Sequence, residues 1–430
     1  MRPAVRQDPA RAAVAGPARG AGARDTSRPA PPLPPITGRS VKCVNGKAAG
    51  FDCHNVELLA FLPISALGGG PEVIVDDLWG WTDSASGREF ALVGRTDGTA
   101  FVEVTDPVKP RYLGYLPYHQ GAHPTEFRGV KVYQHYAFVV SDQSGPHGLQ
   151  VFDLTQLLAV PRPPAVFQET AHYDRFETAH TLILNEATGY AYAAGGNTCG
   201  GGLHMVDVRT PTRPTFAGCY TDRSVGGGAA GDLSAWIHDA QCVLYHGPDQ
   251  PFRGHELCLT AAMGGLGIAD VTDKQHPKTI GFGVYPNPGG IHQGWFTDDQ
   301  RYFFVDDELD EFYAQVDGTP MHTRTLVFDL AKLEDPVLLT EYYATTTAID
   351  HNLYIRGRYM YQANYAAGLR ILDIQDPQHP REVGYLRTTL AADAVATGDG
   401  AFGSYPYFRS KAIAVSSMRE GLFLVRALAE

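Results

Sequence analysis

The most constraining feature of this chain is a short segment that recurs along nearly its whole length. Each copy starts near a small or flexible residue and continues as an alternating apolar strand, and all but the last end in an acid. The copies are spaced 44 to 63 residues apart, and such a period indicates a repeat architecture. They are GTAFVE (98–103), GLQVFD (148–153), GLHMVD (202–207), GLGIAD (265–270), RTLVFD (324–329), GLRILD (368–373) and GLFLVR (421–426).

Every copy is flanked by further strand-like segments. A strand such as YAFVVS or YFFVDD precedes it, and another such as HTLILN stands before that. A turn with Asp-Pro or another x-Pro step follows, and then a segment such as RYLGYLPY. Four short strands per unit is the content of a propeller blade, and the 47 Gly and 30 Pro suit many tight turns. The sequence therefore predicts an all-β, seven-bladed β-propeller.

The two ends of the repeat region provide a test of this count. After GLFLVR only four residues remain, too few for a last strand, whereas VELLAFLPI (56–64) resembles the fourth strands of the other units. We predict that this early segment completes the last blade and closes the ring, which removes free sheet edges. Residues 41–430 then form a single propeller domain. Residues 1–40, rich in Ala, Pro and Arg, are predicted to be disordered.

Six cysteines fall into three pairs that are close in sequence. Cys242 and Cys258 flank an expected hairpin with its turn near Asp249, so they would face each other across it. An even count with compatible spacing favours disulfides and an exported protein; a zinc site is the alternative, but no Cys-x-x-Cys pair occurs. The predicted bridges are Cys43–Cys53, Cys199–Cys219 and Cys242–Cys258.

The location that this implies is extracellular, cell-surface or periplasmic. The first 40 residues hold no apolar run that would serve as a signal-peptide core, and no transmembrane segment is evident. The cysteine pattern and the N-terminus therefore disagree: a misassigned start, another export route and reduced thiols in a cytoplasm are the three explanations. We give the cysteine pattern the greater weight.

The formal net charge of −12 argues against nucleic acid as a partner, because phosphate binding needs a basic surface. Two catalytic motifs are also missing: the chain contains neither Gly-x-Ser-x-Gly nor His-Glu-x-x-His. A protein or glycan ligand of unknown identity is the expected partner.

A ring of polar residues is predicted where the first strand of each unit enters the channel. Neutral imidazole and carboxylate are ligands for divalent transition metals, so such a ring could bind one. The alternative is a set of side chains that bond one another and water to fill the channel end. Either His238 or Asp239 could hold the position in its unit. The aligned residues are Asp77, Arg128, His180, Asp239 (or His238), His292 and His351, with Phe402 in the last unit.

A second ring comes from the ends of the second strands. These residues could face the same channel mouth, or they could only cap the turns that follow, which is the default interpretation. They include Arg95, Asp97, Asp142, Asn197, Asp307 and Asn364.

Two further features have a structural and a functional interpretation. The acidic run DDELDE (306–311) offers oxygen ligands for calcium, but it lacks EF-hand spacing, and a solvated acidic loop is the expectation. Trp79, Trp81 and Trp295 are expected in the blade cores, with a sugar-binding platform as the alternative.

Several stretches together resemble the choice-of-anchor B proteins, whose repeat is named for the run Leu-Val-Ile-Val-Asp. They include CVNGKAAGFDCHNVELLAFLP, HGLQVFDLTQL, HDAQCVLYHGPD, HQGWFTDDQRYFFVDDELDE and YQANYAAGLRILD, and the resemblance covers about residues 41–428. It implies a propeller that is exported or attached to the surface, often through a variable C-terminal anchor. It implies no agreed active site, so no catalytic residue is transferred. The chain ends at Glu430 without a sorting tail, which favours secretion or periplasmic release.

Two functions from different classes follow. The first is a non-catalytic binding or adhesion scaffold of the cell envelope or extracellular space, preferred because no catalytic motif is present. The alternative is a metal-dependent enzyme, a hydrolase or an oxidoreductase, that uses the His/Asp ring. The candidate cofactors are a divalent transition metal or calcium, and a purely structural surface-layer role is a third option.

Overall fold

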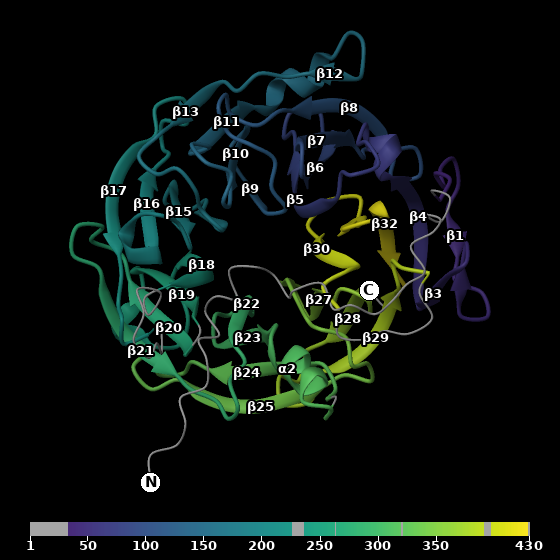
Figure 1. Ribbon diagram of the computed structural model, residues 1–430. Helices are drawn as coiled ribbons and strands as arrows, with labels where there is room; N and C mark the ends of the chain where they lie inside the picture. The colour runs from purple at the N-terminus through teal and green to yellow at the C-terminus, as the bar shows by residue number, and fades with distance from the viewer. Residues whose placement is uncertain (1–32, 226–235, 263, 320, 391–396, 429–430) are drawn as a thin grey trace.

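Seven β-sheets stand around a central axis in the computed structural model (Figure 1), which describes residues 33–225, 236–262, 264–319, 321–390 and 397–428. The predicted seven-bladed propeller is confirmed. In every blade the strands run antiparallel from an inner strand beside the axis to an outer one. The repeated segments found in the sequence are the third strands.

Apart from the added strand β12, the first four blades use consecutive stretches of chain. Blade 1 holds β5 (Val75–Thr82), β6 (Glu89–Arg95), β7 (Gly98–Glu103) and β8 (Arg111–Leu116), with β12 (Ala165–Val166) added in parallel. Blade 2 holds β9 (Arg128–Tyr133), β10 (Tyr136–Ser141), β11 (Leu149–Asp153) and β13 (Ala171–Tyr173). Blade 3 holds β14 (Thr181–Asn185), β15 (Tyr190–Ala194), β16 (Leu203–Asp207) and β17 (Thr215–Tyr220). Blade 4 holds β18 (Ile237–Leu244), β19 (Glu256–Ala262), β20 (Gly265–Asp270) and β21 (Lys278–Gly283).

The last three blades take in the early strands as well. Blade 5 holds β22 (Ile291–Phe296), β23 (Tyr302–Asp307), β24 (Arg324–Asp329) and β25 (Val337–Tyr343). Blade 6 holds β26 (Leu353–Arg356), β27 (Tyr359–Ala363), β28 (Leu369–Asp373) and β29 (Arg381–Leu386), extended by β3 (Phe51–His54) and β2 (Lys47–Ala48). Blade 7 holds β30 (Ala401–Tyr405), β31 (Ile413–Ser417), β32 (Gly421–Ala427), β4 (Val56–Pro63) and β1 (Val41–Lys42). The helices are short: η1 (Ile64–Leu67), η2 (Leu154–Ala159), η3 (Cys199–Gly201), η4 (Gln250–Phe252) and α2 (Asp310–Val316).

The predicted closure of the ring is present. β4 pairs antiparallel with β32, placing Leu62 opposite Leu422 and Glu57 opposite Arg426, and these last two side chains form an ion pair at 3.2 Å. The backbone of Ile36 also bridges to Phe61 in β4. Residues 1–32, most of the segment predicted to be disordered, lie outside the described residues.

The acid that ends the third strand has a local structural role. The Asp207 carboxylate accepts the Arg209 N–H two residues later at 3.0 Å, and Asp329 accepts the Ala331 N–H at 2.9 Å. This Asx-type contact fixes the turn toward the outer strand. Asp329 also pairs with Arg301 at 2.9 Å, which ties the turn to the hairpin before it. These contacts explain why the repeat ends in an acid.

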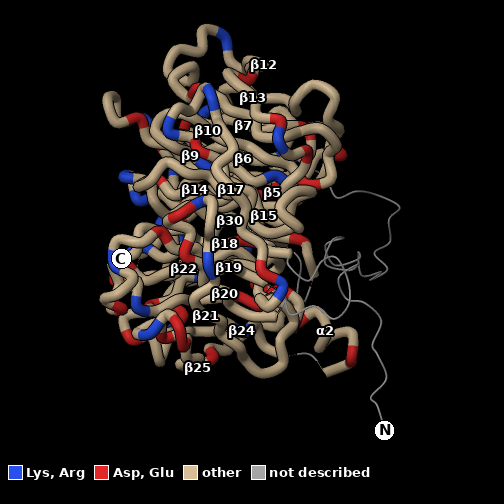
Figure 2. Tube along the Cα trace, turned by 90° about the vertical axis from the view of Figure 1, so that its left-hand side faces the viewer, with Lys and Arg blue, Asp and Glu red and all other residues tan. Residues whose placement is uncertain are grey.

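All three predicted disulfides are formed: Cys43–Cys53, Cys199–Cys219 and Cys242–Cys258. Cys242 and Cys258 lie directly opposite in the β18–β19 register, as the hairpin argument requires. Basic and acidic residues alternate over the side of the propeller seen in Figure 2. Across the described ranges, no helix has the length and apolar character that a membrane span requires. The disulfides and the propeller fit an extracellular protein.

Candidate metal centre

Four histidines from consecutive blades line up at the entry end of the inner strands. His180 directly precedes β14, His238 and His292 are the second residues of β18 and β22, and His351 precedes β26 by two residues. Neighbouring ring centroids lie 4.3 Å (His180–His238), 4.0 Å (His238–His292) and 4.1 Å (His292–His351) apart. We call these four residues the histidine arc. The structure thus brings together the histidines selected from the sequence.

β-bulges set the register of the arc. The β18–β19 register shifts between Ile237 and Asp239, so that His238 is the extra residue, and β22 has a similar shift just after Ile291. A bulge turns the extra side chain away from the regular alternation. His238 rather than Asp239 therefore contacts His180 and His292. Asp239 lies one residue further along β18, where its Oδ1 accepts the Ala240 N–H at 2.6 Å.

Three of the four rings have their Nδ1 atom next to a group that can only accept a hydrogen bond. His180 Nδ1 lies 3.1 Å from the Asp142 carboxylate, His238 Nδ1 lies 3.0 Å from the His292 carbonyl oxygen, and His351 Nδ1 lies 2.5 Å from that of Phe402. Each Nδ1 must therefore carry the proton and donate it. In a neutral ring the Nε2 atom is then left with a bare lone pair.

These lone pairs meet. The Nε2 atoms of His180 and His238 are 2.8 Å apart, the distance of a hydrogen bond, although a neutral ring that donates from Nδ1 has no proton at Nε2 to share. Burial, the main cause, holds the pKa values of His238 and His292 well below the ordinary range and lowers that of His351 to about 3. The neutral rings are thus favoured, and a cation between them would remove the repulsion.

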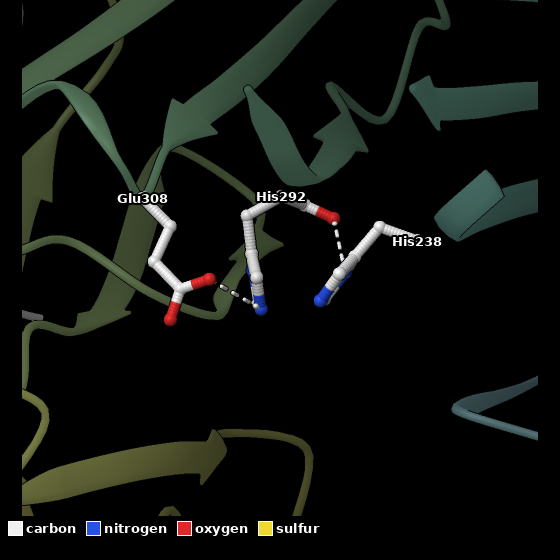
Figure 3. Close-up of side chains that lie close together, drawn as sticks. All are labelled: His238, His292 and Glu308. Atoms are coloured by element: carbon white, nitrogen blue, oxygen red, sulfur yellow. Dashed lines mark hydrogen bonds and ion pairs between the residues drawn. The ribbon is translucent and has the colours of Figure 1, made fainter. Parts of the chain in front are cut away.

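Glu308 adds a carboxylate to the arc. Its Oε2 lies 3.9 Å from His292 Nε2, and the ligand atoms of His238, His292 and Glu308 all lie within 4.8 Å of one another. Figure 3 shows the two rings and the carboxylate approaching one another from neighbouring segments. The Tyr365 hydroxyl donates to Glu308 Oε1 at 2.8 Å and so orients the carboxylate.

The sequence analysis missed Glu308 because it treated 306–311 as a solvated acidic loop, and that expectation is wrong. Four of the five acids in this run are buried: Asp306, Asp307, Asp310 and Glu311. The signal that could have found Glu308 is its place directly after β23, whose end lies beside the start of β22.

Three of these buried acids, Asp307, Asp310 and Glu311, contact one cation, Arg324. Its Nε lies 2.7 Å from Asp310 Oδ2 and its Nη2 lies 3.2 Å from Asp307 Oδ2, while its backbone N–H donates to Glu311 at 2.8 Å. Asp307 also accepts the Tyr285 hydroxyl at 2.7 Å. We call Arg324, Asp307, Asp310 and Glu311 the Arg324 network.

The remaining candidates of the first predicted ring lie outside the histidine arc. The Asp77 carboxylate pairs with Lys131 Nζ at 3.3 Å, deeper along the inner strands. Arg128 is buried over the Tyr118 ring at 4.2 Å and donates to Gln150 at 3.2 Å.

The second predicted ring divides into four kinds of residue, and Asp307 belongs to the Arg324 network. Asp142 orients His180, as described above. Arg95 pairs with Asp97 at 2.7 Å, and Asn197 Oδ1 accepts the Glu177 N–H at 3.1 Å, so these three residues stabilise loops. Asn364 is fully buried, and its side chain has no hydrogen-bond partner in the described part of the chain.

Comparisons with known proteins support the repeat and the fold. Residues 187–222 and 351–388, in blades 3 and 6, match the LVIVD repeat family. No curated protein matches the chain. The chain is similar to a structure of a protein from Lactobacillus plantarum (TM-score 0.50, 13% identity, 80% of this chain and 88% of that chain). It is also similar to Kuenenia stuttgartiensis hydrazine synthase (TM-score 0.51, 12% identity, 76% and 88%). At such identities the likeness shows the fold alone.

Proposed function

We propose that this protein is an extracellular, non-catalytic β-propeller scaffold that binds one divalent transition-metal ion at the mouth of its central channel. The observation that carries the proposal is the 2.8 Å approach of His180 Nε2 to His238 Nε2 while both Nδ1 atoms are committed as donors. Metal-ligating histidines characteristically donate their second ring nitrogen to a carboxylate or a backbone carbonyl.

The donor set fits zinc or copper better than calcium. His238 and His292 would supply imidazole nitrogen and Glu308 a carboxylate oxygen, because their ligand atoms all lie within 4.8 Å of one another. His180, whose Nε2 lies 2.8 Å from His238 Nε2, would be the third imidazole. Three imidazoles and one oxygen suit Zn²⁺ or Cu²⁺, whereas Ca²⁺ takes six to eight oxygen ligands. Asp142 and Tyr365 would act as positioning residues for His180 and Glu308. His351, the outer member of the arc, would pack against His292.

Metal-dependent catalysis is the second candidate, and one observation favours it. Glu308 is fixed by Tyr365 at 2.8 Å but stands 3.9 Å from His292 Nε2, so it could accept a proton from a water or substrate held at the site. A bound metal would supply Lewis acidity. The scaffold stays first because the chain carries no recognised catalytic motif.

The wider setting is also part of the proposal. The two LVIVD matches, the propeller and the disulfides support membership of the choice-of-anchor B group and a secreted, periplasmic or cell-surface location. A protein or glycan partner on one face of the ring suits such a scaffold.

The decisive experiment is metal loading followed by elemental analysis. Purified parent protein is dialysed against Zn²⁺, Cu²⁺ or Mn²⁺ beside His238→Gln, His292→Gln and the control His276→Gln, a histidine exposed on the surface. We expect one ion per chain in parent and control, and a loss of affinity of about 100-fold or more in the two arc variants. Electron paramagnetic resonance of the Cu²⁺ form should show coupling to several imidazole nitrogens.

The outcome that excludes the site is equally direct. If the folded parent protein holds no more metal after dialysis than the buffer alone, the histidine arc is only a polar lining of the channel. Equal binding by His238→Gln and the parent would place the ion elsewhere. Near-ultraviolet circular dichroism establishes that each variant is folded before its metal content is compared.

A further inference from the structure

A cavity of about 490 Å³ lies at the opposite end of the inner strands. Along β18, His238 stands at the entry end, whereas Asp239, Gln241 and Leu244 line the cavity, with the exposed His246 at its outer rim. A strand rises about 3.3 Å per residue, so the outer rim is roughly 20 Å from the histidine arc. This volume is typical of a pocket for a small molecule.

Aromatic rings form one side of this cavity. Trp79, Trp295 and Tyr354 all line it, and the Tyr354 ring packs edge-on against both indoles, with centroids 5.6 Å and 4.9 Å away. Trp81, in contrast, is stacked on Phe90 inside blade 1, which is the core position expected for all three tryptophans. Trp79 is also buried in this hydrophobic core, whereas Trp295 is only partly buried and differs from the expectation in facing the cavity.

Two glutamines present unused donors to the same space. Gln241 Oε1 accepts the Phe296 N–H at 2.8 Å, and Gln293 Oε1 accepts the Leu353 N–H at 3.0 Å. Both side chains line the cavity, and neither Nε2 donates to any group in the described ranges. Each amide is therefore held by its oxygen with its two N–H donors available. Asp239 Oδ2 supplies a matching acceptor, because only its Oδ1 is engaged.

The charged side chains of the cavity oppose an anionic ligand. Lys131 Nζ is already paired with Asp77 at 3.3 Å and lies over the Trp79 ring at 4.4 Å. The acids Asp239 and Glu186 also line the cavity and would repel an anion. A ligand that matches both the amide donors and the acceptor needs groups that accept and donate, and hydroxyl groups do both.

We propose that this cavity binds an uncharged carbohydrate, one or two sugar rings in size. The C–H face of a pyranose would pack on Trp295, which is only partly buried, since aromatic rings provide large apolar contact area. Its hydroxyls would accept from Gln241 and Gln293 and donate to Asp239. The site is separate from the proposed metal centre, so either proposal can fail without the other.

The test is a binding titration followed by calorimetry and tryptophan fluorescence. The probes are glucose, galactose, mannose, N-acetylglucosamine, lactose and cellobiose, with glucuronate as the charged counterpart. Gln241→Glu and Gln293→Glu each keep the oxygen that accepts the backbone N–H but remove the amide donor. Gln378→Glu makes the same chemical change at an exposed position outside the cavity.

We expect saturable binding of at least one neutral sugar. Its affinity should fall about tenfold in each cavity variant, the size of one lost hydrogen bond, and stay unchanged in Gln378→Glu. Asp239→Asn, which keeps the oxygen bonded to Ala240, serves as a third variant if a glutamine change prevents folding. Metal content should be the same in the parent and in Gln241→Glu.

Three results would overturn the carbohydrate site. One is the absence of saturable binding by every neutral sugar. Another is binding that none of the cavity variants weakens, which would place the sugar elsewhere on the protein. The last is tighter binding of glucuronate than of the neutral sugars, which would contradict the charge argument.

Discussion

Blade 5 contributes residues to two buried polar clusters, the Arg324 network and the histidine arc, which differ in how their buried polar groups find partners. In the Arg324 network the chain supplies its own cation: Arg324 contacts Asp307 and Asp310, and Asp307 also accepts the Tyr285 hydroxyl. In the histidine arc the Nε2 atoms of His180 and His238 face each other at 2.8 Å while both Nδ1 atoms are already used as donors. One cluster has a cation from the chain, and the other needs one from outside it.

This difference distinguishes buried polar groups that stabilise the fold from buried polar groups that are available to bind a ligand. A buried group that is fully bonded stabilises one conformation, whereas an unmatched group costs free energy and persists where a ligand compensates it. The two clusters are a single residue apart in sequence, at Asp307 and Glu308, so proximity in sequence does not decide the role. The following predictions are ordered by the size of the expected effect.

Removing the cation of the Arg324 network should have the largest effect. Arg324→Met leaves Asp307 and Asp310 buried without their counter-charge, and we expect the free energy of unfolding to fall by about 3–5 kcal/mol. Urea denaturation followed by tryptophan fluorescence measures it. The control Arg301→Met breaks an exposed pair with Asp329 and should cost less than about 1 kcal/mol. Equal losses of unfolding free energy in the two variants would show that the buried Arg324 matters no more to stability than an exposed arginine.

Metal should stabilise the folded protein through the histidine arc alone. At a free Zn²⁺ concentration about a hundred times the dissociation constant, we expect the free energy of unfolding to rise by about 2.7 kcal/mol. His238→Gln should abolish this gain, whereas His276→Gln, an exposed histidine, should retain it. A gain of the same size in His238→Gln would show that the ion binds outside the arc.

The pH dependence of the Arg324 network offers the most specific effect, and the smallest when it is counted for each pH unit. Burial is the main cause that raises the pKa of Glu311, to about 11, with Asp310 adding to it. The folded protein thus keeps a proton that the unfolded chain loses above the ordinary glutamate pKa, so this group lowers stability as pH rises from 5 to 8. Glu311→Gln removes the effect, and its stability relative to the parent should increase by about 1 kcal/mol for each pH unit in that range.

Denaturation curves of Glu311→Gln and the parent at pH 5 and pH 8 give this comparison directly. Gln can still accept the Arg324 N–H that Glu311 Oε1 accepts at 2.8 Å, so the backbone contact is retained. A difference that is constant or that shrinks with rising pH would show that Glu311 is ionised in the folded protein.

The fold was largely accessible from sequence because the information is local and repeated. The third strands were located almost to the residue, as in 98–103 and 265–270, since each is bounded by glycine and an acid that caps the next turn. The closure by β4 followed from counting strands, and the disulfides followed from hairpin symmetry. Each of these arguments uses neighbours in the chain.

The site was accessible only in part because it depends on irregular backbone. A bulge in β18 brings His238, not Asp239, into contact with its neighbours, and such a one-residue shift leaves no mark in an alternating pattern. Glu308 was missed because a run of acids looks solvated unless its buried counter-charge is known, and Arg324 lies 16 residues later. The cavity beside Trp295 combines side chains from several blades, which no local pattern reveals.

Because β4 pairs with β32, the ring can close only after nearly the whole chain has been synthesised. Glu57 and Arg426, paired between these two strands, are 369 residues apart. At translation rates of about 5–20 residues per second, β4 waits roughly 20–70 s for its partner to be made. All eight of its residues are buried in the finished ring, so throughout that delay an apolar strand stays exposed to wrong partners. A circular permutant that starts at β5 would synthesise β4 within about 60 residues of β32 and should refold with less aggregation.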